Sequence, residues 1–245
     1  MIEPDLSDRV ALVTGSATGV GHEILLSLAD CGANVAVHYH TSEAEAEVVA
    51  DRARERGVRA TTVAGDVTSP SEVEDLLDAV EADLGHVEVL VNNVGAFAPE
   101  HWSDLSYDTW RTVMETNLDG TYLCSREVLP AMRDAGWGRI VNVGYASADR
   151  GLVSPKNFPY FAAKTGVLMF TRMLAADTQD DGITVNAVSP YVVENSEEFP
   201  DDLPRDRPAQ FEDVTQAVRF FLEEDSDYLS GQNVAVDGGW LPETV

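Results

Sequence analysis

Tyr160 and Lys164 stand four residues apart, and together their side chains can do proton chemistry. Residues four apart on a helix share one face, so a phenol and an ammonium group would project side by side. A free tyrosine has a pKa of about 10, which is too high for catalysis at neutral pH, and a nearby positive charge lowers that pKa. The pair predicts a tyrosine that exchanges a proton with a carbonyl or alcohol oxygen. The alternative is an ordinary helix with one aromatic and one charged residue.

Short apolar runs alternate with segments of helical periodicity along the chain. This alternation predicts an α/β fold in one domain, residues 1–245, with a doubly wound parallel sheet of about seven strands and helices on both faces. One long helix is expected over 107–135, with a kink at Pro130. The other helices are expected at 20–30, 42–56, 70–84, 158–177 and 212–224, and the strands at 10–13, 34–39, 60–64, 87–91, 139–143, 183–188 and 233–236.

A glycine-rich segment from Thr14 to Gly21 joins the first predicted strand to the first predicted helix. Glycines at such a junction permit a tight turn and a close approach of the backbone to a pyrophosphate, which would rest on the helix N-terminus. The spacing is Gly-x3-Gly-x-Gly rather than the more common Gly-x-Gly-x2-Gly. The segment therefore predicts a nucleotide site.

The chain carries 43 acidic and 16 basic residues, for a net charge of −27. Such a balance disfavours nucleic acid and anionic membranes as partners, since both attract lysine and arginine. The acids are spread along the chain and lysines are scarce, which indicates adaptation to a salt-rich cytoplasm. At about 1 M salt the screening length is only ~3 Å, so self-repulsion is weak. The alternative to a halophilic source is an unusually acidic mesophilic enzyme.

Cys31 and Cys124 are the only cysteines, and they lie in apolar helical patterns. Buried free thiols in a reducing cytoplasm are expected. No spacing of cysteine and histidine predicts a metal site. The first residues lack the basic and apolar regions of a signal peptide, and no apolar stretch approaches the ~20 residues that span a bilayer. We therefore expect a cytoplasmic protein.

Several motifs, taken in order, give the chain its resemblance to the short-chain dehydrogenase/reductase family. They are Thr14 to Gly21, Asp66-Val67, Asn92-Asn93-Val94-Gly95, Asn117, Tyr160 with Lys164, Ser189-Pro190 and Asp237-Gly238-Gly239. The resemblance covers essentially the whole chain. It implies a Rossmann fold, a nicotinamide cofactor, a small carbonyl or alcohol substrate, and a homodimer or homotetramer.

The same resemblance implies which residues hold the dinucleotide. Asp66 would contact the adenine amino group, Asn92 would lie beside the adenosine ribose, and Lys164 would hold the nicotinamide ribose. The full set implied is Gly15, Ser16, Thr18, Gly19, Val20, Gly21, Asp66, Val67, Asn92, Gly95, Tyr160, Lys164, Pro190 and Val193.

The end of the second predicted strand bears on the choice of cofactor. An NAD-specific site usually places Asp or Glu about 20 residues beyond the glycines, where it binds the ribose 2′-hydroxyl. Here the run 38–42 is His-Tyr-His-Thr-Ser, with no carboxylate. This favours NADP(H), whose 2′-phosphate would meet His40, Thr41 and Ser42, and the run is similar to that of pteridine reductases. The family's usual basic residue in the glycine loop is replaced by Thr18, so NAD(H) stays an alternative.

The resemblance also assigns catalytic roles. Tyr160 would act as general acid in reduction, Lys164 would lower its pKa, and Asn117 would anchor a water that links Lys164 to solvent. The family's catalytic serine has two possible counterparts. Ser147 lies at the usual distance before Tyr160, whereas alignment on the preceding strand puts Tyr145 in the serine position. A hydroxyl from either residue would polarise a carbonyl oxygen; Ser147 is the first choice.

Three functions remain open at this point. The first is an NADP-dependent reductase of a small ketone or 3-oxoacyl compound. The second is a pterin reductase, and the third is a non-catalytic NADP-binding or sensor protein. An acidic, proline-containing segment at about 191–210 follows the sixth predicted strand. It is expected to be a substrate loop, with a merely solvated acidic loop as the alternative.

Overall fold

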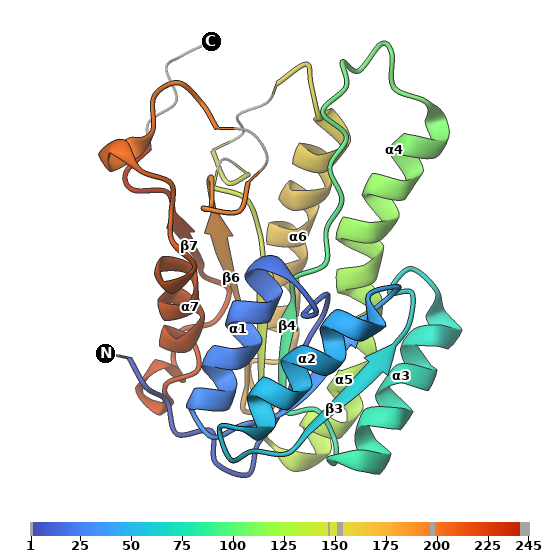
Figure 1. Ribbon diagram of the computed structural model, residues 1–245, viewed down its shortest axis with the longest axis vertical. Helices are drawn as coiled ribbons and strands as arrows, with labels where there is room; N and C mark the ends of the chain where they lie inside the picture. The colour runs from blue at the N-terminus through green and yellow to red at the C-terminus, as the bar shows by residue number, and fades with distance from the viewer. Residues whose placement is uncertain (1, 147, 151–153, 197–198, 241–245) are drawn as a thin grey trace.

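The computed structural model describes residues 2–146, 148–150, 154–196 and 199–240. Within them, strands form one parallel sheet in the order β3-β2-β1-β4-β5-β6-β7 (Figure 1). The predicted α/β fold with a parallel sheet of about seven strands is confirmed. The strands are β1 (Val10–Val13), β2 (Asn34–Tyr39), β3 (Ala60–Ala64), β4 (Val89–Asn92), β5 (Gly138–Val143), β6 (Ile183–Pro190) and β7 (Asn233–Val236).

Helices cover both faces of this sheet. Side chains of α1, α2 and α7 share one apolar cluster with the strands, and side chains of α3, α5 and α6 share another. The fourth helix, α4, packs on α6 beyond the sheet (Figure 1). The bounds are α1 (Gly19–Asp30), α2 (Glu43–Arg54), α3 (Pro70–Asp83), α4 (Tyr107–Met114), α5 (Gly120–Ala135), α6 (Phe158–Asp177) and α7 (Phe211–Phe220).

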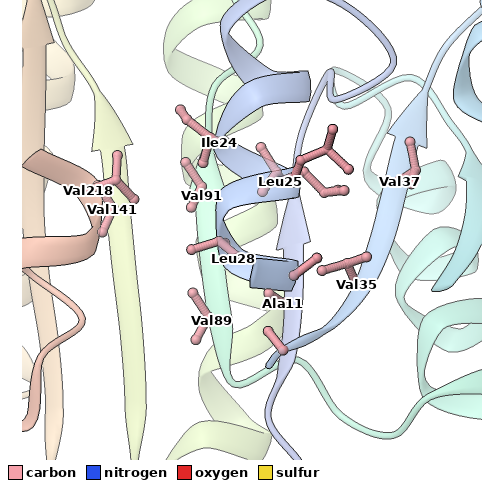
Figure 2. Close-up of a cluster of buried hydrophobic side chains, with 14 of the residues drawn as sticks. Ala11, Ile24, Leu25, Leu28, Val35, Val37, Val89, Val91, Val141 and Val218 are labelled. Atoms are coloured by element: carbon pink, nitrogen blue, oxygen red, sulfur yellow. The ribbon is translucent and has the colours of Figure 1, made fainter. Parts of the chain in front are cut away.

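The alternation of strand side chains divides the core into these two clusters. In β1, Ala11 and Val13 face the cluster that contains α1, while Val10 and Leu12 face the other. Because the sheet is buried on both faces, its strands read as continuous apolar runs. Figure 2 shows the first cluster, with α1 residues Ile24, Leu25 and Leu28 packed against strand residues Ala11, Val35, Val37, Val89 and Val91.

The single helix predicted over 107–135 is wrong. The structure has α4, then a π-helical turn at Glu115–Asp119, then α5. The interruption lies at Asn117, whose Nδ2 donates to Val113 O and to Ala96 O, each at 2.9 Å. Drawing the amide toward the neighbouring loop widens the turn, and such π-turns are frequent at functional sites. Pro130 lies inside α5.

Several other elements end at different residues than predicted, among them β6 and α7. β6 continues to Pro190, because Ser189 and Pro190 pair with Ala235 and Val236 of β7. α7 ends at Phe220, and a 3₁₀ turn follows at Glu224–Ser226. Among the helices of the described residues, none is long and apolar enough to cross a bilayer.

Candidate active site

The order of the sheet reverses direction at β1, because β2 lies on one side of β1 and β4 on the other. In open parallel sheets, ligands bind at the carboxyl ends of the strands where this reversal occurs. The loop from Thr14 to Gly21 leaves β1 at this point, and the loop that begins at Asn93 leaves β4 beside it. The fold therefore brings two of the predicted motifs together.

Asn93 ties these two loops to each other. Its Nδ2 donates to Thr14 O at 3.0 Å and to Gly15 O at 3.3 Å, and its N–H donates to Thr14 Oγ1 at 2.9 Å. A Cβ at Gly21 would lie 2.5 Å from Asn93 Nδ2, so only glycine fits there. The sequence analysis did not name Asn93 as a site residue, although it lies within a motif that was singled out.

His38 of β2 supports the glycine loop from the other side. Gly15 N–H donates to His38 Nδ1 at 2.9 Å, while Nε2 lies 3.0 Å from Gly65 O. The ring must therefore be neutral and protonated at Nε2, since Nδ1 accepts and a carbonyl can only accept. Burial lowers the pKa of His38, which agrees with a neutral ring. Ser16 is also turned inward, because its Oγ accepts from His38 N–H at 3.0 Å.

The residues predicted around the adenosine lie along the same edge. Asp66 follows β3 and its Oδ1 accepts from Thr68 N–H at 2.9 Å and Thr68 Oγ1 at 2.8 Å. Burial raises the pKa of Asp66, but these two hydrogen bonds outweigh it and the net pKa is lowered. Asp66 is thus a carboxylate in a turn, and Val67 beside it is buried.

A hollow of about 480 Å³ opens between the start of α1 and α2. Thr18, the residue before α1, lines it and is exposed, and Glu45 of α2 lies on the opposite side. His40 and Thr41 are exposed at the end of β2, and Ser42 directly precedes α2. The lining consists of Ala17, Thr18, Gly19, His22, Ala44, Glu45, Val48 and Val49.

Asn92 does not present its side chain to this edge. The amide is buried, and its Nδ2 donates to Ser125 Oγ at 3.0 Å and to Asn142 Oδ1 at 2.8 Å. A contact of this side chain with a ribose is therefore excluded in this conformation. Groups on α5 and β5 hold Nδ2, while the buried Oδ1 has no hydrogen-bond partner among the described residues. The place of the Asn92 backbone beside a ribose stays a prediction. Gly95, by contrast, is exposed, and a Cβ there would lie 2.6 Å from Asn117 Oδ1.

Asn117 lies in the π-turn, and the two polar atoms of its side-chain amide differ in their hydrogen bonding. Its Nδ2 makes two hydrogen bonds, whereas its buried Oδ1 finds no partner among the residues that the structure describes. A buried polar atom without a partner costs free energy, so a water or ligand that donates to Oδ1 would be stabilised here. Four other buried side-chain atoms among the described residues also have no partner, and Asn117 Oδ1 is the one that lies beside Lys164 and Gly95. Oδ1 lies next to Gly95, and the position of a Cβ at Gly95 is 3.5 Å from Lys164 Nζ.

Tyr160 and Lys164 share one face of α6, as their spacing predicted. Both side chains are buried, and Lys164 Nζ lies 5.7 Å from the centre of the Tyr160 ring. The ammonium donates to Val143 O at 2.7 Å. Burial lowers the pKa of Lys164 to about 8.

The expected lowering of the Tyr160 pKa is not found. Burial raises the pKa of the Tyr160 phenol, and the nearby Tyr145 adds to the effect. The reason is desolvation: the phenol is only 5% exposed, and the ammonium of Lys164 is turned to Val143 O. Tyr160 is therefore a neutral phenol at neutral pH, which is the form that a proton donor requires.

Of the two candidates for the serine role, Ser147 lies outside the described residues. Tyr145 is described and lies beside Tyr160, with ring centres 5.5 Å apart at 70°. Burial, and then the neighbouring Tyr191, raises the pKa of Tyr145 to about 12, so its hydroxyl keeps its proton. Phe97, which was not predicted from the sequence, contacts Tyr160 with ring centres 4.4 Å apart and the ring planes tilted by 31°.

The segment after β6 reaches toward the glycine loop. Pro190 is buried at the end of β6, and Val193 pairs with Ala209 in an isolated bridge. A Cβ at Gly19 would lie 3.0 Å from Asn195 Nδ2, so this segment passes over the start of α1. The structure thus brings the glycine loop, the π-turn, α6 and the segment after β6 to one edge of the sheet.

The sequence is similar to those of known reductases. A protein-family model described as Enoyl-(Acyl carrier protein) reductase matches residues 15–241. The 3-oxoacyl-(acyl-carrier-protein) reductase of Staphylococcus epidermidis is 33% identical over 242 residues, covering 95% of this chain and 98% of that protein. The corresponding reductase of Pseudomonas aeruginosa is 34% identical over 244 residues, covering 96% and 98%.

Solved structures of dehydrogenases also match this chain. The crystal structure of acetoin dehydrogenase from Salmonella typhimurium matches with a TM-score of 0.88 at 29% identity, covering 97% of this chain and 98% of that one. With the fold described above, these matches define an NAD(P)-dependent oxidoreductase. The chain belongs to the short-chain dehydrogenase/reductase family.

Proposed function

We propose that the protein is an NADP-dependent reductase that acts on a small ketone or 3-oxoacyl compound. The observation that carries the proposal is the buried pair of Tyr160 and Lys164. Beside it lies Asn117 Oδ1, for which the described part of the chain supplies no hydrogen-bond partner. The names of the reductases and of the acetoin dehydrogenase among the relatives support a carbonyl or alcohol substrate.

The residues at the strand ends fit a dinucleotide. Gly21 has no room for a side chain, and the exposed Thr18 stands before α1 with no capping hydrogen bond from its side chain within the described structure. The backbone here can approach a pyrophosphate, as in other nucleotide-binding turns. Along the same edge, Asp66 follows β3 on one side of the glycine loop, and Gly95 follows β4 on the other side, next to Asn117. When bound, the reduced nicotinamide supplies a hydride to the carbonyl carbon.

The protein's own residues handle the proton. The neutral phenol of Tyr160 donates its proton to the carbonyl oxygen as the oxygen gains negative charge. Tyr145 keeps its hydroxyl proton and donates a hydrogen bond to the same oxygen. Lys164 stabilises the phenolate that is left behind, and Asn117 Oδ1 accepts from a water that returns a proton. Ser147 is the other candidate for the role given to Tyr145.

NADP(H) is the cofactor that we propose, because the end of β2 carries no carboxylate. His40, Thr41 and Ser42 precede α2 beside the hollow that Thr18 lines. Hydroxyl and imidazole groups can bind a 2′-phosphate without repelling it, whereas a carboxylate would repel it. Glu45 on the far side of the hollow is the feature that favours NAD(H). The ratio of kcat/KM for NADPH and NADH measures the preference.

Replacing Tyr160 by Phe tests the function directly. We expect the reduction of acetoacetyl thioesters and small ketones to fall by about 10²–10⁴-fold, because the proton donor is lost. NADPH should still bind, which intrinsic tryptophan fluorescence can follow. The matched control is Tyr107→Phe, because Tyr107 is 74% exposed on α4. Activity of Tyr160→Phe near the wild-type rate would remove the assigned acid.

The same assay separates the alternative functions. Turnover of dihydropterins with NADPH, and not of ketones, would make the protein a pterin reductase. Binding of NADPH without turnover of any carbonyl would make the protein a sensor. The tyrosine at position 145, where the family has its catalytic serine, favours this alternative. Assays should be run in molar KCl, because the net charge of −27 supports a salt-rich cytoplasm as the working environment.

We also propose that the chain forms a homodimer or homotetramer. Exposed apolar side chains on α5 and α6 support this, because such groups favour burial against a partner. They are Tyr122, Met169 and Met173. Size-exclusion chromatography with light scattering measures the assembly. The segment at 191–210 is proposed to be the substrate loop, since Asn195 within it lies against Gly19 at the start of α1.

A further inference from the structure

A continuous row of aromatic rings leads away from Tyr160. The Phe97 ring lies 4.4 Å from the Tyr160 ring, centre to centre, with the planes tilted by 31°, and the Tyr145 ring lies 5.5 Å from that of Tyr160. Tyr145 lies 6.3 Å from Tyr191, and Tyr191 stacks on Trp240 at 4.0 Å and 14°. Aromatic rings attract one another at centre-to-centre separations of about 4.5–7 Å. Two of these four pairs lie within that range, and the other two are slightly closer.

The row follows the carboxyl edge of the sheet. Phe97 comes from the loop after β4, Tyr145 follows β5, Tyr191 follows β6, and Trp240 follows β7. These strands are neighbours in the sheet, so consecutive strand ends contribute consecutive rings. Tyr160 joins the row from α6. The fold therefore places the rings beside one another independently of their distances in the sequence.

Phe97 is the ring that a substrate would meet first. It is 64% exposed, yet its ring contacts that of Tyr160, which is only 5% exposed. An exposed aromatic side chain normally gains little by staying at one place on a surface. Here it covers the face of the candidate proton donor, so a carbonyl group that reaches the Tyr160 hydroxyl brings the rest of its molecule against Phe97.

We infer that this row selects carbonyl substrates in which a flat ring is attached directly to the carbonyl carbon. The inference rests on the proposed function and narrows its substrate class. A planar ring can lie against Phe97 and Tyr145 while its carbonyl oxygen reaches Tyr160. A saturated chain gains only the burial of apolar area, whereas a ring also gains the orientation-dependent attraction between aromatic groups.

Two ketones of the same carbon count isolate this effect. Acetophenone carries a flat ring on its carbonyl carbon, and cyclohexyl methyl ketone carries a saturated ring there. We expect kcat/KM with NADPH to be about fivefold higher, or more, for acetophenone, a factor that one or two aromatic contacts provide. The dissociation constants of the two ketones, measured by ligand-detected NMR titration, should differ in the same direction.

Phe97→Leu keeps an apolar side chain but removes the ring. The preference for acetophenone should fall toward 1 in this variant, in both kcat/KM and binding. The matched control is Trp102→Leu, because Trp102 is an exposed aromatic residue of the same loop whose recorded ring neighbour is His101, outside the row. The preference should be unchanged in that control.

The outcomes separate this inference from the proposed function. Ketone reduction with equal preference for the two compounds, or a preference that Phe97→Leu leaves intact, would overturn the inference while the reductase function stands. No reduction of any carbonyl would overturn the proposed function. In that case the binding ratio still decides the role of the row, because it does not depend on turnover.

Discussion

Tyr160 combines two properties that are usually separate. Its position one helical turn before Lys164 suits proton transfer, while burial raises the pKa of its phenol instead of lowering it. A neutral phenol in an apolar site donates a proton readily only when the accepting oxygen gains negative charge. The arrangement therefore suits protonation of an oxygen that is becoming an alkoxide, so Tyr160 contributes most at that moment rather than in the resting protein.

Lys164 provides a direct test of this environment. Burial lowers its pKa to about 8, so the ammonium is fully charged well below pH 8 and loses its charge as the pH rises through about 8. Lys156 is the only other lysine, so ¹³Cε-lysine labelling should give two resonances, and Lys156→Arg leaves that of Lys164 alone. We expect this resonance to titrate with a midpoint near 8. A midpoint above 10 would show that Lys164 is not desolvated as described.

The same titration predicts a pH dependence of activity. The rate of ketone reduction at limiting NADPH should decline above about pH 8, as the charge that stabilises the Tyr160 phenolate is lost. Lys164→Arg cannot lose its charge in this range, so the decline should disappear in that variant even where the maximal rate is lower. A decline at the same pH in Lys164→Arg would assign it to another group.

Among the elements, the π-turn between α4 and α5 matters most for the site. A regular helix would carry Asn117 past the loop after β4, whereas the wider turn lets its Nδ2 reach Ala96 O. The turn also leaves Oδ1 buried beside Gly95. The interruption is therefore what places a polar acceptor within the site, rather than a defect in a long helix.

His38 connects three elements that hold the glycine loop. It lies in β2, accepts from Gly15 N–H after β1, and contacts Gly65 O after β3. Protonation of Nδ1 would place two N–H groups against each other, and the titratable groups near the ring are His40 and Asp66. Burial lowers the folded pKa of His38 below its ordinary value, so the unfolded chain takes up a proton first as the pH falls.

The free energy of unfolding should therefore fall with decreasing pH. The contribution of His38 is complete above about pH 6.5 and is lost as the pH drops toward its lower folded pKa. His38→Gln cannot titrate, so its unfolding free energy, although about 1–2 kcal/mol lower at pH 7, should change less between pH 7 and 5.5. Urea unfolding in molar KCl measures this. His101→Gln is the control and should keep the wild-type slope, because His101 is not among the groups that act on the His38 ring.

For the whole molecule, charge sets the conditions in which the fold is stable. A net charge of −27 on 245 residues repels itself in dilute buffer, and recorded ion pairs such as Arg133 with Asp177 and Asp181 neutralise only part of it. We expect the Tm to rise by about 5–10 °C between 0.1 M and 2 M KCl, equivalent to a gain of ~2–3 kcal/mol. Sucrose at equal osmolality is the control. A Tm that does not respond to KCl would argue against a halophilic protein.

Local patterns in the sequence predicted the sheet, the shared face of Tyr160 and Lys164, and the position of the glycine loop. Apolar runs of four to six residues between helical segments predicted the parallel sheet, because a strand buried on both faces needs apolar side chains at every position. The spacing of Tyr160 and Lys164 predicted their shared face, because the helical repeat alone determines it. The glycine loop was located from its place after β1, since the turn it makes is local.

Other features depend on contacts between distant segments and could not be read in this way. Asn92 turns inward because Ser125 and Asn142 happen to meet it, and the π-turn forms because Ala96 O is available to Asn117. The pKa of Tyr160 rises because the assembled protein removes water from the phenol. Burial is a property of the packed chain, so the direction of this pKa shift depends on the tertiary structure. The row of rings beside Tyr160 depends on it too, because the rings follow strands that are distant in the sequence and adjacent in the sheet.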